Sequence, residues 1–189
     1  MMASMDAAVG AIRAALRRRE LERDTLVVFL SDNGGPTQEL TSRNDPFSGG
    51  KGSLREGGVR VPFLVSWPAR RPAGKVYARP LSALDVLPTA LAAAGRSAPP
   101  GLDGVDLLPF LSGARTEDPH PVLYWRLDRQ RAIREGRWKL VGDALYDLVT
   151  DEKEARDLAA AEPGRVRALE GRLRSWESGL IPPRWTNAR

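Results

Sequence analysis

Apolar residues in the first twenty positions recur at the spacing of one face of a helix. They are Met5, Val9, Ile12 and Leu16, and the alanines between them are strong helix formers. This pattern predicts an amphipathic helix over residues 4–20. Such a helix needs another layer of structure to cover its apolar stripe.

Two predicted strands follow this helix. Residues 25–30 form a continuous apolar and β-branched run, which is typical of a strand buried on both faces in a parallel sheet. Residues 59–67 form a second run, and we expect it to enter the sheet after Pro62, because proline cannot donate a ladder hydrogen bond. Between them, residues 37–58 are rich in glycine and polar residues without periodicity. Loops of this length are usually functional or disordered.

A second helix is predicted over residues 82–94, with Leu84, Leu87 and Leu91 on one face. Asp85 lies at its expected start, where a capping role is favoured over a ligand role. A strand, a loop, a strand and a helix in this order indicate an α/β layer.

The second half of the chain changes to short apolar runs separated by turn residues. The runs are 122–126, 132–134, 138–141 and 144–148. They predict an antiparallel meander, and a helix over residues 163–177 would cover one face of it. The predicted fold class is α/β: part of a parallel sheet with helices over residues 1–115, then a small antiparallel sheet packed by a C-terminal helix over residues 116–189.

Composition and charge exclude several classes of protein. The formal net charge is +5, but the arginines are spread through every segment and interleaved with acids, which argues against nucleic-acid binding. No apolar stretch approaches the roughly 20 residues of a membrane span, so we expect none. The first residues lack the order of a signal peptide, which leaves localisation open. The absence of cysteine excludes disulfides, thiolate metal sites and a cysteine nucleophile.

Asp32 and Asn33 follow the first predicted strand directly. They offer a carboxylate and an amide oxygen at the mouth of an open α/β sheet, where ligands characteristically bind. Such hard oxygen ligands suit Ca²⁺ or Mg²⁺. The alternative is a plain turn, because Asp, Asn and the following Gly34 all favour turns for backbone reasons.

Lys51 is surrounded by glycines that allow the backbone to approach a ligand closely. A lysine in this setting could hold an anion as a point charge. The alternative is a flexible, solvated loop, and the spacing is not that of a phosphate-binding P-loop. Arg60 is expected to hold the loop through backbone carbonyls or to pair with Glu56.

Residues 25–34 (TLVVFLSDNG) and 49–62 (GGKGSLREGGVRVP) together resemble the paired signature of sulfatases in the alkaline phosphatase-like superfamily. The resemblance continues through residues 84–95, 104–113, 132–140 and 145–158. It implies that residues 1–115 are the C-terminal half of a sulfatase catalytic domain, and that the complete protein hydrolyses sulfate esters of a small molecule or sugar. It also implies that Asp32 and Asn33 are metal ligands and that Lys51 contacts the sulfate.

Sulfatases attack with a formylglycine, made from cysteine or sometimes serine in a Cys/Ser-x-Pro-x-Arg segment near the N-terminal end of the domain. We expect this chain to lack that segment and, alone, to be an inactive fragment that needs a missing N-terminal half. The alternatives are a non-catalytic module that binds anions or a protein partner, and a phosphonate or phosphate monoester hydrolase of the same superfamily.

Overall fold

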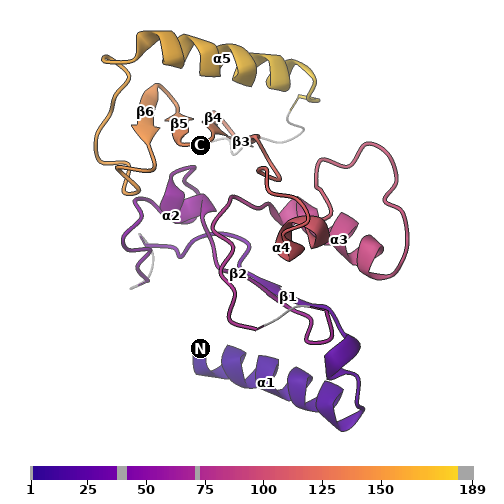
Figure 1. Ribbon diagram of the computed structural model, residues 1–189. Helices are drawn as coiled ribbons and strands as arrows, with labels where there is room; N and C mark the ends of the chain where they lie inside the picture. Colours follow the sequence, from indigo (N-terminus) through magenta and orange to yellow (C-terminus); the bar gives the residue numbers. More distant parts are fainter. Residues whose placement is uncertain (1, 38–41, 71–72, 183–189) are drawn as a thin grey trace. The chain divides into compact units, whose positions relative to one another are not determined.

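The computed structural model describes residues 2–37, 42–70 and 73–182 (Figure 1). Two compact units divide the chain. One consists of Met1–Leu30 and Pro62–Pro119, and the other of Ser31–Val61 and His120–Arg189. Within the first unit lie α1 (Met2–Arg18), η1 (Glu22–Asp24), β1 (Val27–Leu30), β2 (Phe63–Ser66), η2 (Ala83–Asp85), α3 (Val86–Ala93) and α4 (Leu108–Ser112). Within the second lie α2 (Glu56–Val59), β3 (Val122–Leu127), β4 (Gln130–Glu135), β5 (Trp138–Val141), β6 (Ala144–Asp147) and α5 (Pro163–Ser178).

The two strands of the first unit pair with each other in the antiparallel direction. Val27 lies opposite Ser66, and Leu30 lies opposite Phe63. The expectation of a parallel sheet is therefore wrong for this pair, although β2 does begin after Pro62 as predicted. The apolar run of β1 favours a strand buried on both faces, whereas all four of its residues are only half-buried. The run carries no information about the direction of the neighbouring strand.

The helical segment formed by η2 and α3 begins with a capping box, as the sequence indicates. The Ser82 side chain accepts from the backbone N–H of Leu84 at 3.2 Å, and Asp85 Oδ2 accepts from the N–H of Ser82 at 2.8 Å. Asp85 Oδ1 also accepts from the N–H of Val105 at 2.9 Å. The fully buried carboxylate thus joins the start of this helix to a later loop, which confirms its structural role.

The second unit is built on a four-stranded meander in the order β3-β4-β5-β6, and every neighbouring pair is antiparallel. α5 runs along this sheet (Figure 1). The shared core contains Ile133, Leu140 and Leu145 from the strands, with Leu169 and Leu173 from α5. Both the meander and the covering helix are confirmed as predicted.

Among residues 2–37, 42–70 and 73–182, no helix is both long enough and apolar enough to cross a membrane.

The end of β6 carries a carboxylate whose charge is stabilised by several donors. Arg137 donates to Asp147 through Nε at 2.6 Å and through Nη2, and the Thr150 hydroxyl donates at 3.0 Å. The hydrogen bond from Arg137, aided by those from Thr150 and the Val149 N–H, lowers the pKa of Asp147 from 3.8 to about 2. Because this folded-state pKa is depressed, the carboxylate stabilises the fold above its unfolded pKa. That contribution is lost as the pH falls from about 4 through about 2.

We predict that Asp147→Asn lowers the urea midpoint of unfolding at pH 7, because the variant keeps the shape but loses the charge that Arg137 binds. The difference from the unaltered protein should shrink between pH 4 and pH 2, where the native carboxylate is protonated. Urea titrations at pH 7, 4 and 2 measure this. Asp143→Asn, in the exposed turn after β5, is the control and should have little effect. An Asp147→Asn effect of equal size at all three pH values would contradict the assignment.

Candidate metal and anion site

Asp32 and Asn33 lie in a turn immediately after β1. The Ser31 hydroxyl donates to the carbonyl of Asn33 at 2.8 Å, which closes the turn around Asp32. Asp32 is exposed and Asn33 is half-buried. Within the part of the chain that the structure describes, neither side chain makes a hydrogen bond or an ion pair. Their oxygens are therefore free of competing protein donors there.

The backbone brings the segment around Lys51 to this turn. The N–H of Lys51 donates to the carbonyl of Gly35, two residues after Asn33, at 3.2 Å, and the N–H of Gly34 donates to the carbonyl of Gly58 at 3.0 Å. Two segments that are separated along the chain thus lie side by side. The side chain of Lys51 is exposed.

Asn44 holds the same two segments together with its side-chain amide. Its Oδ1 accepts from the N–H of Gly35 at 2.9 Å, and its Nδ2 donates to the carbonyls of Gly35 and Gly49 at 3.0 Å each. All three hydrogen bonds of the Asn44 amide group are made with backbone groups that lie close in the sequence to the predicted site residues. The sequence does not single out Asn44, because one polar residue in a polar loop gives no periodic signal.

Two glycines make this close approach possible. A Cβ on Gly34 would lie 1.7 Å from the carbonyl oxygen of Gly57, and a Cβ on Gly50 would lie 2.5 Å from that of Gly35. Real Cβ atoms do not come this close to backbone oxygens, so any larger residue would push the two segments apart. Gly34 and Gly50 therefore allow the two backbones to pack against each other.

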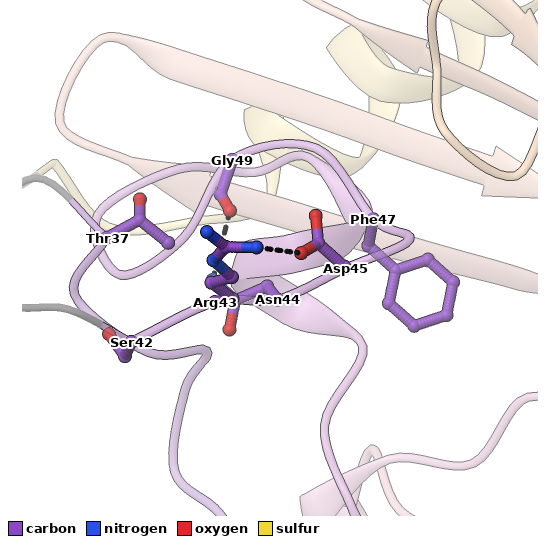
Figure 2. Close-up of a pocket in the computed structure, with 7 residues that line it drawn as sticks. All are labelled: Thr37, Ser42, Arg43, Asn44, Asp45, Phe47 and Gly49. Atoms are coloured by element: carbon purple, nitrogen blue, oxygen red, sulfur yellow. Dashed lines mark hydrogen bonds and ion pairs between the residues drawn. The ribbon is translucent and has the colours of Figure 1, made fainter.

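Asn44 also lines an open cavity of about 560 Å³ (Figure 2). Figure 2 shows Arg43 and Asp45 side by side, with Phe47 next to Asp45. The charged groups of Arg43 and Asp45 lie 3.9 Å apart. The lining is mostly polar. The guanidinium of Arg60 lies 4.4 Å from the centre of the Phe47 ring, which is cation–π distance. Residues 38–41, within the predicted long loop, lie outside the described residues.

Arg60 also makes the ion pair that the sequence suggested. Its Nη1 lies 3.9 Å from Glu56 Oε2 and 3.7 Å from Glu152 Oε2. The predicted pairing with Glu56 is confirmed. Because the Arg60 side chain is about half exposed, solvent weakens these ion pairs.

A buried ionic cluster beneath the loop was not predicted. Lys139 Nζ lies 2.7 Å from Glu56 Oε1 and 3.0 Å from Glu154 Oε1, and all three side chains are at most 2% exposed. Glu154 Oε2 accepts from the backbone N–H of Glu56 at 2.7 Å. The sequence signal that could have found it is a lysine at the centre of an apolar strand, Trp138–Val141, which requires an anionic partner if it is buried.

Among the described residues, no group of three or more His, Asp or Glu side chains is arranged to hold a metal ion. Asp32 and Asn33 therefore offer two possible oxygen ligands for a metal ion, which do not make a complete coordination shell.

A comparison with known protein families identifies the family of this chain. The family described as Sulfatase matches residues 1–96, about half of the chain, including the Asp32–Asn33 turn and the loop of Lys51. The chain belongs to the sulfatase family. Residues 97–189 lie beyond that match, although similarity to individual sulfatases extends into them.

Curated sulfatases match most of this chain. The steryl-sulfatase of Mus musculus is 44% identical over 152 residues, which are 75% of this chain and 24% of that protein. The N-acetylgalactosamine-6-sulfatase of Canis lupus familiaris is 36% identical over 140 residues, which are 71% of this chain and 27% of that protein. The chain thus spans about a quarter of the length of these sulfatases.

Solved structures extend the similarity to the whole fold and confirm the predicted fold class. Ps i-CgsB in complex with k-i-k-neocarrahexaose matches with a TM-score of 0.88 and 31% identity, over 100% of this chain and 44% of that one. The phosphonate monoester hydrolase of Agrobacterium radiobacter matches with a TM-score of 0.75 and 27% identity, over 94% of this chain and 40% of that one.

The expectation that the chain contains no Ser-x-Pro-x-Arg string is wrong. Residues 66–70 read Ser-Trp-Pro-Ala-Arg. This string follows the Asp32–Asn33 turn in the chain, whereas the sulfatase resemblance places the formylglycine segment before it. Ser66 is the last residue of β2 and pairs with Val27, and the following Trp67 is buried. We therefore do not assign it as the nucleophile segment.

We predict that Gly34→Ala destabilises the second unit by about 1–3 kcal/mol, because the added methyl group would overlap the Gly57 carbonyl. Urea unfolding measures the loss. Gly171→Ala is the matched control: it lies in α5 with open space around it, and alanine there should stabilise the helix by up to about 1 kcal/mol. Equal effects of the two substitutions would show that the close approach at Gly34 does not exist.

We also predict that Lys139→Met destabilises the fold by about 3–5 kcal/mol, because it leaves two carboxylates buried without their cation. Lys153→Met, at an exposed position nearby in the sequence, should change the free energy of unfolding by less than about 0.5 kcal/mol. Chemical denaturation of both variants measures the difference. A loss below about 1 kcal/mol for Lys139→Met would mean that the cluster is open to water.

Proposed function

We propose that this chain is part of a sulfate ester hydrolase, in which Lys51 binds the sulfate group and Asp32 and Asn33 hold a divalent cation. The observation that carries the proposal is the hydrogen bond from Lys51 N–H to the Gly35 carbonyl, two residues after Asn33. It supports a single site formed by the two sulfatase signature segments. Residues 1–115 would then belong to the catalytic domain, and residues 116–189 would form a C-terminal subdomain.

The donor chemistry of Asp32 and Asn33 fits Ca²⁺ or Mg²⁺, which bind carboxylate and amide oxygens. Both side chains are free of hydrogen bonds and ion pairs to other described residues, as a ligand pair requires. A calcium ion takes six to eight oxygen ligands, so this pair would supply part of its shell. When bound, the cation would polarise a sulfate oxygen and neutralise developing negative charge.

Lys51 would contribute a fixed positive charge beside the sulfate. Negative charge builds on the oxygens of a sulfate ester as its S–O bond breaks, and a positioned ammonium stabilises that charge in the transition state. The ammonium can donate three hydrogen bonds and cannot accept any. Its role would therefore be to bind and orient the anion, while the proton transfers and the nucleophilic attack belong to other groups.

The nucleophile would come from outside this chain. The chain spans about a quarter of the matched sulfatases, and we infer that a formylglycine supplied by the remainder of the complete protein makes the attack. Alone, the chain would bind anions without turnover. If the purified chain cleaves a chromogenic aryl sulfate in the presence of Ca²⁺, this part of the proposal is wrong.

The substrate would be a sulfated small molecule or sugar. Among the similar proteins, one is named for a steryl sulfate, another for N-acetylgalactosamine-6-sulfate, and a third is solved with k-i-k-neocarrahexaose. A phosphonate or phosphate monoester is the second candidate, and the similarity to the phosphonate monoester hydrolase favours it specifically. A module that binds an anion or a protein partner without catalysis is the third.

We predict that the chain binds sulfate and that Lys51→Ala weakens this binding at least about tenfold, because a charged hydrogen bond contributes about 1.5–3 kcal/mol. Asp32→Ala should remove Ca²⁺ binding and leave the far-ultraviolet circular dichroism unchanged. Calorimetric titration with sulfate, phosphate and Ca²⁺ measures each effect, and Lys75→Ala, at an exposed loop position of the first unit, is the control. Equal sulfate affinity in Lys51→Ala and the unaltered chain would remove Lys51 from the site.

A further inference from the structure

The segment that carries Lys51 is rich in glycine, and it makes hydrogen bonds within itself, such as the one from the Ser53 N–H to the Gly50 carbonyl at 2.9 Å. Between Ser48 and Gly58 it has five glycines, and Gly49 and Gly52 adopt positive φ angles of 76° and 83°. Glycine loses more conformational freedom on ordering than any other residue. Contacts from outside the segment therefore add to its own hydrogen bonds in holding Lys51 in an ordered position.

One carboxylate ties the two ends of this segment together. Glu154 Oε2 accepts from the Ser48 hydroxyl at 3.0 Å, three residues before Lys51, and from the Glu56 N–H at 2.7 Å, five residues after it. The Gly57 N–H also donates to the Ser48 carbonyl at 2.8 Å. The base of the loop is thereby closed around a buried side chain that lies about a hundred residues away in the sequence.

One face of the meander meets this closed base. Arg134, Lys139 and Tyr146 lie opposite one another on β4, β5 and β6. Arg134 Nη1 lies 3.8 Å from Glu56 Oε2, and Lys139 Nζ lies 2.7 Å from Glu56 Oε1.

The third residue of this row reaches the loop through Arg55. Arg55 Nη2 donates to the Tyr146 hydroxyl at 3.0 Å, and Arg55 Nη1 donates to the Glu154 carbonyl at 3.0 Å. Side chains alternate between the faces of a strand. The face of the sheet opposite the apolar α5 side is therefore the one that holds the loop.

A separate contact holds the tip of the loop. Gln130, the first residue of β4, donates from Nε2 to the carbonyl of Gly52 at 2.9 Å. Gly52 follows Lys51 directly. Lys51 is thus bracketed by the closed base on one side and the Gln130 contact on the other.

We propose that Gln130, Lys139 and Glu154 are positioning residues, which make the C-terminal meander the support that fixes Lys51 for anion binding. This inference rests on the proposed anion contact of Lys51. A lysine ammonium sits at the end of a flexible stem, so a binding site gains affinity when the backbone beneath that stem is already ordered. The meander would then act on the bound anion through the loop, without touching the anion.

The test uses Gln130→Met, because Gln130 is exposed and its loss should not unfold the protein. Amide hydrogen exchange and sulfate titration are both followed by nuclear magnetic resonance on the full chain. We expect the amides of Lys51 and Ser53 to exchange about three- to tenfold faster, and the Kd for sulfate to rise about three- to tenfold, as the loss of one hydrogen bond implies. The thermal midpoint should not change.

Glu154→Gln is the second variant, because it keeps the size of the side chain and removes its charge. It should speed exchange across the whole loop, from Gly49 to Gly58, more than Gln130→Met does. Asp143→Asn, in the exposed turn between β5 and β6, is the control and should leave loop exchange as it is.

Three outcomes would overturn the inference or its basis, each in a different way. Unchanged exchange at Lys51 and Ser53 in Gln130→Met would show that the meander does not order the loop. Faster exchange with an unchanged Kd would show that this order does not matter for the anion. Failure of the unaltered chain to bind sulfate, with faster exchange in the variants, would instead reject the proposed role of Lys51 and leave the meander as a structural support only.

Discussion

A lysine buried between two carboxylates is the interaction on which the second unit depends. Removing charged groups from water costs several kcal/mol per ion, and only close contacts and full hydrogen bonding offset that cost. Lys139 provides the close contacts, because it lies 2.7 Å from Glu56 and 3.0 Å from Glu154. The hydrogen bonding is incomplete, since Glu56 Oε2 and Glu154 Oε1 are buried without a hydrogen-bond partner among the described residues. Glu56 belongs to the glycine-rich loop, and Lys139 belongs to the meander. Neither element can move away without leaving an unpaired charge in the interior, so the two are fixed to each other.

The small meander can make this connection because its two faces have different chemistry. One row across the strands, Ile133, Leu140 and Leu145, packs against α5. The next row, Arg134, Lys139 and Tyr146, reaches the loop. Strand alternation places neighbouring residues on opposite faces, so the burial of both Lys139 and Leu140 is a direct result of a sheet covered on both sides. The burial of side chains along β5 therefore does not alternate, although their apolar or charged character does.

The difference between local and long-range interactions explains which features the sequence could predict. The meander and α5 follow from turn residues and helical spacing, which are local signals. The Asp32–Asn33 turn and the glycines around Lys51 are local too, so the sequence alone is enough to select them as candidates. The partners of Lys139 are not local: Glu56 precedes it by 83 positions, and no periodicity links them. The antiparallel pairing of β1 with β2 is likewise a property of two segments together, which the apolar run of either one does not contain.

Two features shape the Lys51 loop, its glycines and the buried ionic cluster, and their effects complement each other. Glycine at positions 34 and 50 removes the side chains that would keep the backbones apart, but a glycine-rich loop loses the most entropy when it becomes ordered. A buried carboxylate that joins both ends of the loop offsets this loss, because it shortens the free segment to the few residues around Lys51. The glycines thus permit the close approach of the two backbones, and the ionic cluster stabilises it. A loop that had only the glycines would be free to fluctuate, and one that had only the cluster could not bring Lys51 to the Asp32–Asn33 turn.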